Sequence, residues 1–575
     1  MNNIKSYSKR SFIALIVLFV VQACSDSLDF YPEDDVSDAS YWKQPSDFKA
    51  IASDFYFSLK AWGRYDDDSD IITNTNFPSS ISDGSYIAPE TNGVWNDSYT
   101  QIRSANYLIE KAGQYEGDKN EISQYLGEAR FFRAYLYFRL LKDFGGVPLI
   151  LTPLNIDSEE LSEPRATRDE VADQIMSDLE VAITNLPGES AIADADKGRI
   201  SKEAAQGFMS RVALYEGTWQ KFRGNSGRAN TLLGEAVDAA RAVINSGEYE
   251  LFMALGDSSY KYAFIVDNNF LAKSNPLGLG KTDVKEFLIA RRYSREFNIS
   301  HGHSHALSQA LSPTKKLADM YLCADALPID KSPLFEGRDE ITSEYNNRDL
   351  RMNHSLMIKG NRYYSYGSFG RDFDNPDNPG PGTGIHFPNF GENTVTGYSI
   401  HKTSTENKGN NGGEEEFDYP VLRYAEVLLN YAEAKFELDG SISDADLDLS
   451  LNVVRNRGQL PALTNAFVSG NGLDMREEIR RERTVELVLE GFRLDDLKRW
   501  KTAEVEMPKA VRGVLYTGTE YETDPIYESL ESSLDGEGYF VRQAESNRQF
   551  LERHYLFPIP TREVNIMGLK QNPDW

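Results

Sequence analysis

Four carboxylates crowd into residues 65–70, which read Tyr-Asp-Asp-Asp-Ser-Asp. Asp66, Asp67 and Asp68 could accept hydrogen bonds from the neighbouring hydroxyls of a sugar, and the same hard oxygens could coordinate a structural Ca²⁺ ion. A solvated acidic loop is the plainer alternative, because charged side chains are mostly exposed and glycine and serine are frequent nearby. We take these three aspartates as candidate carbohydrate-binding residues.

Aromatic residues beside polar ones form a second group of candidates. Sugar rings present C–H groups that pack on aromatic faces, while guanidinium and carboxylate groups hold the hydroxyls. If residues 361–366 are extended, Arg362 and Tyr364 share one face, although an ordinary strand with aromatic packing would have the same pattern. Trp95 opens a predicted helix and is either a stacking platform or a core residue. Tyr398 is a weaker candidate of the same kind.

Three histidines, His301, His303 and His305, alternate with single residues. On a strand their imidazoles would point the same way, as a zinc or nickel ion requires. Glycine and serine surround them, and no acidic or cysteine ligand stands close in the sequence. We therefore predict no metal ion here and no cofactor elsewhere.

Residues 476–499 carry seven basic and seven acidic side chains. Their balanced charge predicts a helix laced by ion pairs and argues against a phosphate-binding groove. No serine-hydrolase, zinc-protease, nucleotide-binding or dinucleotide-binding motif appears in a supporting context. These residues therefore give no motif for catalysis. Two functions stay open on the residues alone. One is glycoside hydrolysis, which needs two carboxylates about 5–10 Å apart, and the other is the role of a structural adhesin.

Amphipathic helices must position these residues. Between residues 122 and 140 apolar side chains recur at intervals of three and four, so one helical face must be covered by protein. Gly145 and Gly146 tolerate positive φ and Pro148 cannot continue a helix, so the helix should end there. Comparable patterns come in pairs, at 101–114 with 121–142, 168–186 with 201–220, and 421–438 with 445–457. Such pairs indicate a tetratricopeptide-like scaffold without a strict period.

Between about 250 and 420 the composition shifts to glycine, asparagine, proline, serine and tyrosine. Such segments lie on surfaces and carry recognition when a rigid scaffold presents them, so we expect the ligand here and at the loop 62–95. The predicted fold class is mostly α. It combines a helix-pair scaffold with a loop-rich, irregular half that carries few short strands.

Six blocks, in order along the chain, resemble the SusD/RagB family of surface glycan-binding lipoproteins of Bacteroidetes. The blocks are residues 95–108, 127–149, 423–438, 451–460, 479–500 and 555–575. The resemblance implies a non-enzymatic receptor that forms a lid on a SusC-type TonB-dependent outer-membrane transporter and passes it oligosaccharides. It also implies that four helix-pair units build the scaffold.

The resemblance further implies one domain over residues 41–575. We place its scaffold at about 41–250 and 421–501, its ligand-binding region at about 251–420, and a C-terminal segment at 502–575. Cys323 stands in a segment that lies near the ligand in the family, so we include it among the candidate carbohydrate-binding residues. A buried thiol that merely packs is the alternative.

The start of the chain is basic and is followed by the ten apolar residues 12–21, which have the form of a secretory signal. Ten residues are too few to span a bilayer core of roughly 30 Å. The run ends in Val-Gln-Ala-Cys, which resembles a lipoprotein processing site, so we expect a signal peptide at 1–23 and a lipid on Cys24; an ordinary signal peptide is the alternative. Residues 24–40 would be an acidic tether. The resemblance implies attachment to the outer membrane, facing the cell surface.

The net charge of −28 is a surface property, because 40% hydrophobic and 12% aromatic residues suffice for a sizeable core. So negative a surface repels polyanions, which excludes nucleic acid as a partner. For the same reason we expect a neutral glycan such as a fructan rather than a uronic or sulfated polymer. With Cys24 lipidated, Cys323 would be the only other cysteine, so no intramolecular disulfide is expected.

Overall fold

A computed structural model of the protein describes residues 41–76, 78–155, 157–266, 277–304, 310–358, 394–404, 413–523, 531 and 533–575. Helices dominate this part of the chain, which confirms the predicted fold class. None of the described helices is both long and apolar enough to cross a membrane. The domain limits set from the sequence stay a prediction.

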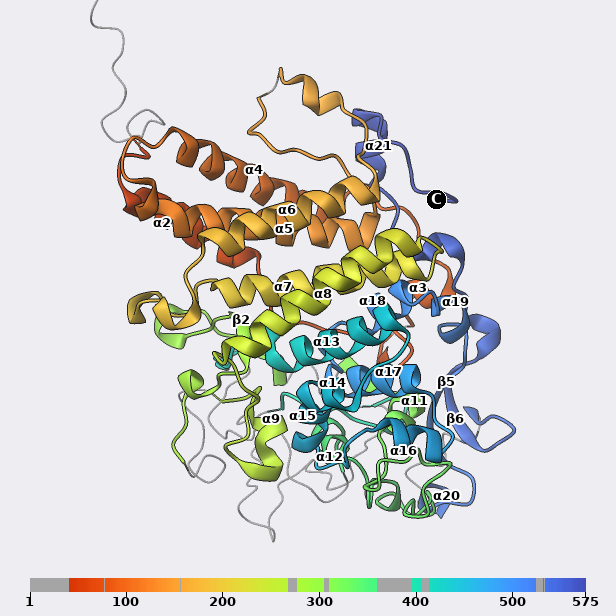
Figure 1. The fold of residues 1–575 in the computed structure, drawn as a ribbon. Helices are drawn as coiled ribbons and strands as arrows, with labels where there is room; N and C mark the ends of the chain where they lie inside the picture. The colour runs from red at the N-terminus through yellow and green to blue at the C-terminus, as the bar shows by residue number, and fades with distance from the viewer. Residues whose placement is uncertain are drawn as a thin grey trace, which may run out of the picture.

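The scaffold is a stack of helices in which each packs on the next along the chain (Figure 1). The stack continues from α8 onto α13 (Tyr424–Asp439), which follows much later in the sequence. Its first members are α2 (Pro45–Asp54), α4 (Gly93–Gln114), α5 (Ser123–Phe144), α6 (Arg168–Asn185), α7 (Lys202–Lys221) and α8 (Ser226–Ser246). The first two predicted pairs are therefore present, and α8 adds a partner for α7 that was not foreseen as part of a pair. The third differs from the prediction, because residues 419–423 form a strand and the predicted helix 445–457 is divided at Ser450 into α14 (Asp444–Leu449) and α15 (Leu451–Arg457).

The helix α5 lies in the centre of the upper layers. Phe132, Leu136 and Leu140 are almost fully buried, as the periodicity predicts. Phe131, Ala134 and Leu141 on other faces are buried too, because α4 and α6 both pack against this helix. The sequence indicated one covered face, and the structure covers more than one.

The stop after α5 uses its two glycines differently. Gly145 adopts φ +75°, the region that glycine tolerates without a Cβ penalty. Gly146 has no positive φ; a Cβ there would lie 2.1 Å from the carbonyl oxygen of Ala166. The N–H of Ala166 donates to the carbonyl of Val147 at 3.0 Å, so two backbone segments run in direct contact. Positive φ was thus the correct expectation for Gly145 and the wrong one for Gly146.

The predicted single helix over 476–499 is wrong, because the chain forms α17 (Met475–Glu486) and α18 (Arg493–Arg499) with a break between them. Leu489 and Gly491 take φ values of +66° and +79° in the break. The carboxylate of Asp66 accepts the N–H of Leu489 at 2.7 Å and that of Arg493 at 3.1 Å. A distant aspartate therefore satisfies backbone donors that a continuous helix would have paired internally.

Within the described residues, strands are few and short and pair two by two. Each pair is antiparallel: β1 (Ile72–Asn74) with β3 (Leu311–Pro313), β2 (Phe287–Arg291) with β4 (Tyr419–Arg423), and β5 (Val511–Leu515) with β6 (Tyr539–Gln543). The chain leaves the scaffold after β2 and returns at β4, where Phe287 pairs with Arg423 and Arg291 with Tyr419. In Figure 1 the loop-rich segments lie at the end of the stack opposite α4.

A buried ion-pair network joins the two halves. Arg423, at the end of β4, donates to Glu286 at 2.9 Å, to Glu486 at 2.7 Å and to Glu490 at 2.8 Å. Other cations complete the pairing of these carboxylates; they are Arg351, Lys402 and Arg457. We call these seven residues the Arg423 network. The predicted ion pairs of 476–499 are thus real, but many of their partners come from other elements.

Candidate functional site

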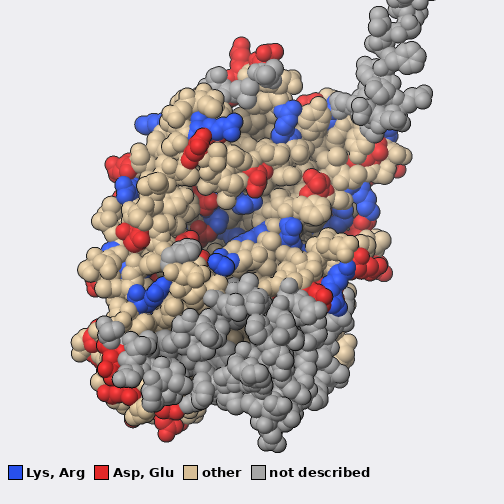
Figure 2. Space-filling view, turned by 180° about the vertical axis from the view of Figure 1, so that it is seen from behind, with Lys and Arg blue, Asp and Glu red and all other residues tan. Residues whose placement is uncertain are grey.

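A cavity of about 740 Å³ opens between α5, α7, α18 and the loop 57–65 that follows α2. Its volume is within the range of small-ligand sites. Seen from behind, the molecule is hollowed across its middle, and Lys and Arg side chains gather in this hollow (Figure 2). The cavity is the best-formed candidate site among the described residues, and we call it the central pocket.

One wall of the central pocket is a face of α5. Tyr135, Arg139, Lys142 and Asp143 follow one another at helical spacing and all line the cavity. Lys142 forms an ion pair with Asp495 of α18. Burial raises the pKa of Asp143, and Arg139 lies near enough to oppose this effect. Within the described chain, however, Arg139 has no hydrogen bond or ion pair of its own.

The opposite wall, from α7 and α18, is held by ion pairs within the protein. Arg211 donates to Glu426 at 2.7 Å and to the carbonyl of Val421 at 2.6 Å. Arg499 donates to Glu433 at 2.7 Å and to Asp496 at 2.8 Å. These guanidinium groups have their carboxylate partners already, so they fix the shape of the wall.

The third wall comes from the loop after α2. Lys60 donates to the carbonyl of Glu490 at 2.8 Å, and its ammonium lies 3.8 Å from the ring centre of Tyr65. Burial lowers the pKa of Lys60 to about 7; Lys142 lowers it further and Asp66 opposes the change. The pocket therefore contains an amine that changes charge near neutral pH.

The mouth of the pocket carries an exposed aromatic ring. Phe57 is 63% exposed. The guanidinium of Arg291 donates to the carbonyls of Phe57 and Leu59 at 2.6 and 3.1 Å and lies 5.9 Å from the Phe57 ring centre. A ring beside a fixed cationic donor is the combination that sugar recognition uses.

Behind this loop lie two of the three histidines. The ring of His303 stacks on Trp62 with 4.2 Å between centroids, and His301 faces the carbonyl of Phe417 at 2.9 Å. Burial holds the pKa of His303 well below its usual value. His305 is outside the described residues. In the part of the chain that is described, no group of three or more His, Cys, Asp and Glu side chains could hold a metal ion.

The aspartates of residues 66–70 have different partners and different exposure in the structure. Asp66 is 7% exposed and caps the break between α17 and α18; burial raises its pKa to about 6, against the lowering effect of those N–H bonds. Asp70 is paired with Arg493 at 2.8 Å. Asp67 and Asp68 are half-buried and accept hydrogen bonds from Asn74 and Ser79. Of the three candidates, only Asp67 and Asp68 keep surface that a ligand could reach.

Three further candidates lie in the interior, which corrects the expectation that they offer surface to a sugar. Trp95 is 4% exposed, and its ring packs against Tyr99 and Phe144. Tyr398 is 1% exposed and donates its hydroxyl to Glu344 at 2.9 Å. Cys323 is fully buried. At these positions the structure favours the packing alternatives.

Arg362 and Tyr364 lie outside the described residues, as does Cys24. The sequence interpretation missed Phe57, Lys60, Arg139 and Arg291, which meet in the central pocket. A signal for one of them exists: Arg139, Lys142 and Asp143 are charged residues that follow one another closely on a helix with many buried positions. Charged side chains on an otherwise buried helix indicate a polar cavity.

Comparisons with known proteins find SusD-like sequences along most of the chain. A family model described as "SusD family" matches residues 289–575, and a second, described as "Starch-binding associating with outer membrane", matches residues 33–214. SusD-like protein P38 of Formosa agariphila is 25% identical over 88% of this chain and 93% of its own length. A SusD-like protein of Bacteroides ovatus is 24% identical over 97% of this chain and 93% of its own length.

Solved structures show the same fold. A SusD-like carbohydrate binding protein from Bacteroides fragilis superposes with a TM-score of 0.70 at 21% identity, covering 91% of this chain and 98% of its own. Surface glycan-binding protein A from Bacteroides fluxus superposes with a TM-score of 0.58 at 19% identity, covering 93% and 100%. At these low sequence identities, the similarity to the solved structures shows that the chain has the same fold.

Proposed function

The chain belongs to the SusD/RagB family, and from this premise we propose that it is a carbohydrate receptor in nutrient uptake. The observation that carries the proposal is the central pocket, with Phe57 exposed at its mouth and Arg291 fixed beside it. Aromatic walls, fork donors and carboxylates together provide both kinds of contact that a sugar needs. The receptor binds oligosaccharide or polysaccharide without cutting it.

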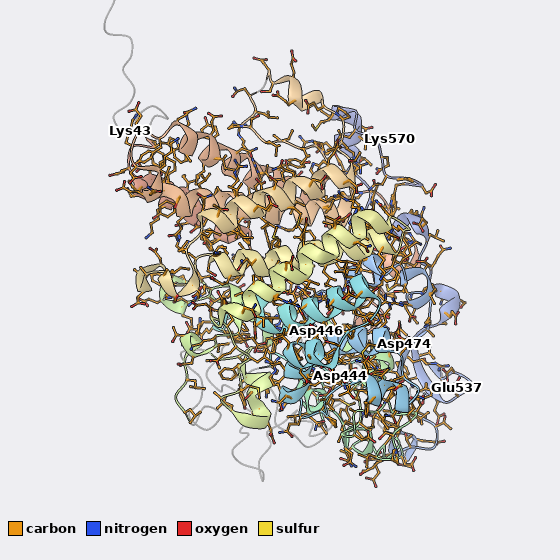
Figure 3. All side chains as sticks on the ribbon, viewed as in Figure 1. Lys43, Asp444, Asp446, Asp474, Glu537 and Lys570 are labelled. Carbon is orange, nitrogen blue, oxygen red and sulfur yellow. The ribbon has the colours of Figure 1, made fainter. Side chains whose placement is uncertain are left out.

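We further propose that the receptor is held to the outer membrane by lipid on Cys24 and acts as a lid on a SusC-type transporter. Lys43, near the start of the described chain, lies at the helical end of the molecule, whereas Asp444 and Glu537 lie farther down (Figure 3). The loop-rich half lies at the far end from α4 (Figure 1). A tether from Lys43 would leave the loop-rich half free, with helical surfaces for the partner.

Titration calorimetry against a broad panel of plant, host and microbial glycans, with chromatography of the products, tests the proposal. Heat of binding without released sugars supports a receptor. Released sugars would support a glycoside hydrolase, and no heat across the panel would support an adhesin.

We expect Phe57→Ala to weaken binding of the glycan found in this panel by about two- to tenfold, because a well-placed aromatic contact contributes about 0.5–1.5 kcal/mol. Thermal stability should not change, since most of the ring is in solvent. Calorimetry of the variant measures the effect. Phe297→Ala is the matched control, because Phe297 is 71% exposed and does not line the pocket. If Phe297→Ala weakens binding and Phe57→Ala does not, the sugar lies elsewhere.

A further inference from the structure

We propose that the central pocket binds the acidic group of a glycan, either the carboxylate of a uronic acid unit or a sulfate ester. The inference rests on the proposed function, that this chain binds carbohydrate, and specifies the class of carbohydrate. An acidic ligand differs from the neutral glycan that the overall negative charge led us to expect. The reason is the sign of the unpaired charges inside the pocket.

The pocket is lined by both cations and carboxylates, and most of them neutralise each other. Lys142 is paired with Asp495, and Arg483 with Asp496 at 2.9 Å. Arg211 and Arg499 are paired as described above. Glu490 is bound by Arg423 and by Lys402 at 2.7 Å. These groups leave little net charge for a ligand.

Three cations in the pocket have no carboxylate partner among the described residues. Arg291 and Lys60 donate to backbone carbonyls, Arg291 also interacts with the Tyr293 hydroxyl, and Arg139 makes no hydrogen bond within the described chain. On the acidic side, Asp97 is exposed and Asp143 makes no ion pair within bonding distance. Burial raises the pKa of Asp143 and lowers that of Lys60 to about 7, so it weakens the charge of both groups and leaves Arg139 and Arg291 as the cations without a carboxylate partner. The unpaired groups therefore favour an anion.

The guanidinium of Arg139, which lines the pocket, has the chemistry to bind an oxyanion. A guanidinium presents parallel N–H donors that match a carboxylate or sulfate bidentately. Lys60 offers a point charge from the facing loop, and Tyr65 and Tyr135 line the space between the two walls. Gln101, also in the lining, has a buried side-chain oxygen without a hydrogen-bond partner. A sugar hydroxyl would satisfy this acceptor, which an isolated inorganic anion could not do.

The net charge of −28 does not oppose this assignment. Repulsion between exposed charges is screened over about 8–10 Å at physiological salt. In a recess with low-dielectric walls the nearest charges dominate the field. In Figure 2 Lys and Arg side chains gather in the hollow beside some acidic ones, although acidic residues outnumber basic ones in the chain as a whole.

The experiment uses ligand pairs that differ only in charge. The mature chain, with Cys24 replaced by serine to keep it soluble, is titrated with tetragalacturonate and its methyl ester, and with a sulfated galactan tetrasaccharide and its desulfated form. We expect at least one acidic member to bind about tenfold or more tightly than its neutral partner, as a charge-assisted hydrogen bond allows. The two pairs separate carboxylate from sulfate.

The results separate the preference for acidic glycans from carbohydrate binding itself. If neutral glycans bind as tightly as acidic ones, or more tightly, the inference is overturned and the receptor function stands. If no carbohydrate in the broad panel binds, both are overturned.

Arg139→Gln tests the residue assignment. We expect its affinity for the acidic ligand to fall about tenfold while affinity for the neutral partner is unchanged. Its melting temperature should not fall, because Arg139 has no partner to lose. Arg562→Gln is the matched control, since Arg562 is exposed and outside the central pocket. Should Arg139→Gln fail to fold, Arg291→Gln replaces it. Wild-type affinity of the folded variant for the acidic ligand would overturn the assignment.

Binding of the acidic ligand should also weaken as pH rises from 6 to 8. Lys60, with a pKa of about 7, loses its positive charge over this range. The charged groups that face it are Asp66 on its own loop, Lys142 on α5, Arg211 on α7 and Asp495 on α18. Lys60→Met should flatten the profile. Binding of the acidic ligand that strengthens toward pH 8 would contradict the assignment.

Discussion

Replacing Arg423 by methionine should lower the free energy of unfolding by about 3–5 kcal/mol, the cost typical of removing one partner from a buried ion pair. Arg423 is 1% exposed and bonds three carboxylates, those of Glu286, Glu486 and Glu490. Without its guanidinium these carboxylates stay buried with fewer cations. Urea denaturation at pH 7, with the denaturant dependence compared between variants, measures the loss.

Arg512→Met is the matched control for this prediction. Arg512 pairs with Asp535 at 2.7 Å and with Glu537 at 3.1 Å on the surface between β5 and β6. Exposed pairs contribute about 0–1 kcal/mol, so little change is expected. Equal losses in the two variants would mean that the Arg423 network contributes no more than a surface pair does.

Replacing Gly146 by alanine should destabilise the protein by about 3 kcal/mol, at the upper end of the usual cost of overpacking. The new Cβ would lie 2.1 Å from the carbonyl oxygen of Ala166, far inside contact distance, and the clash is with backbone. Relief requires the segment that begins α6 to move away from the end of α5. Thermal and urea unfolding of the variant measure the loss.

Gly234→Ala is the control, and its expected sign is opposite. Gly234 lies inside α8, and a Cβ there would meet nothing within 4 Å. Alanine favours a helix interior over glycine by about 0.5–1 kcal/mol, so this variant should be slightly more stable. If both variants lose stability alike, the close approach at Gly146 is not the cause.

The helical half of the fold could be predicted because its signals are local. The spacing of Phe132, Leu136 and Leu140 and the glycine at position 145 fix a helix and its end within one stretch of chain. The break at Leu489 could not be predicted in the same way. It depends on the carboxylate of Asp66, more than 400 positions away, and nothing near Leu489 in the sequence shows that partner.

The candidate site was harder to predict for the same reason. Lys60, Arg139 and Arg291 line one cavity although they come from the loop after α2, from α5 and from β2, and each looks like an ordinary surface cation in the sequence. Trp95 shows the opposite error. Its position after an acidic loop fits a sugar platform, but the same ring fills the space between α4 and α5, and burial cannot be read from one residue type.

The antiparallel pairing of β2 with β4 closes everything between residues 292 and 418 into one excursion whose two ends meet at a single ladder. Closing a chain loop costs only about 0.6 kcal/mol more for each doubling of its length. The excursion is also tied to the rest of the molecule away from this ladder, because β3 pairs with β1 and because Arg351 and Lys402 form ion pairs with Glu486 and Glu490. Changes in its length should therefore be tolerated only where they leave these contacts intact, whereas the central pocket, whose lining includes no residue between 292 and 418, would keep its walls.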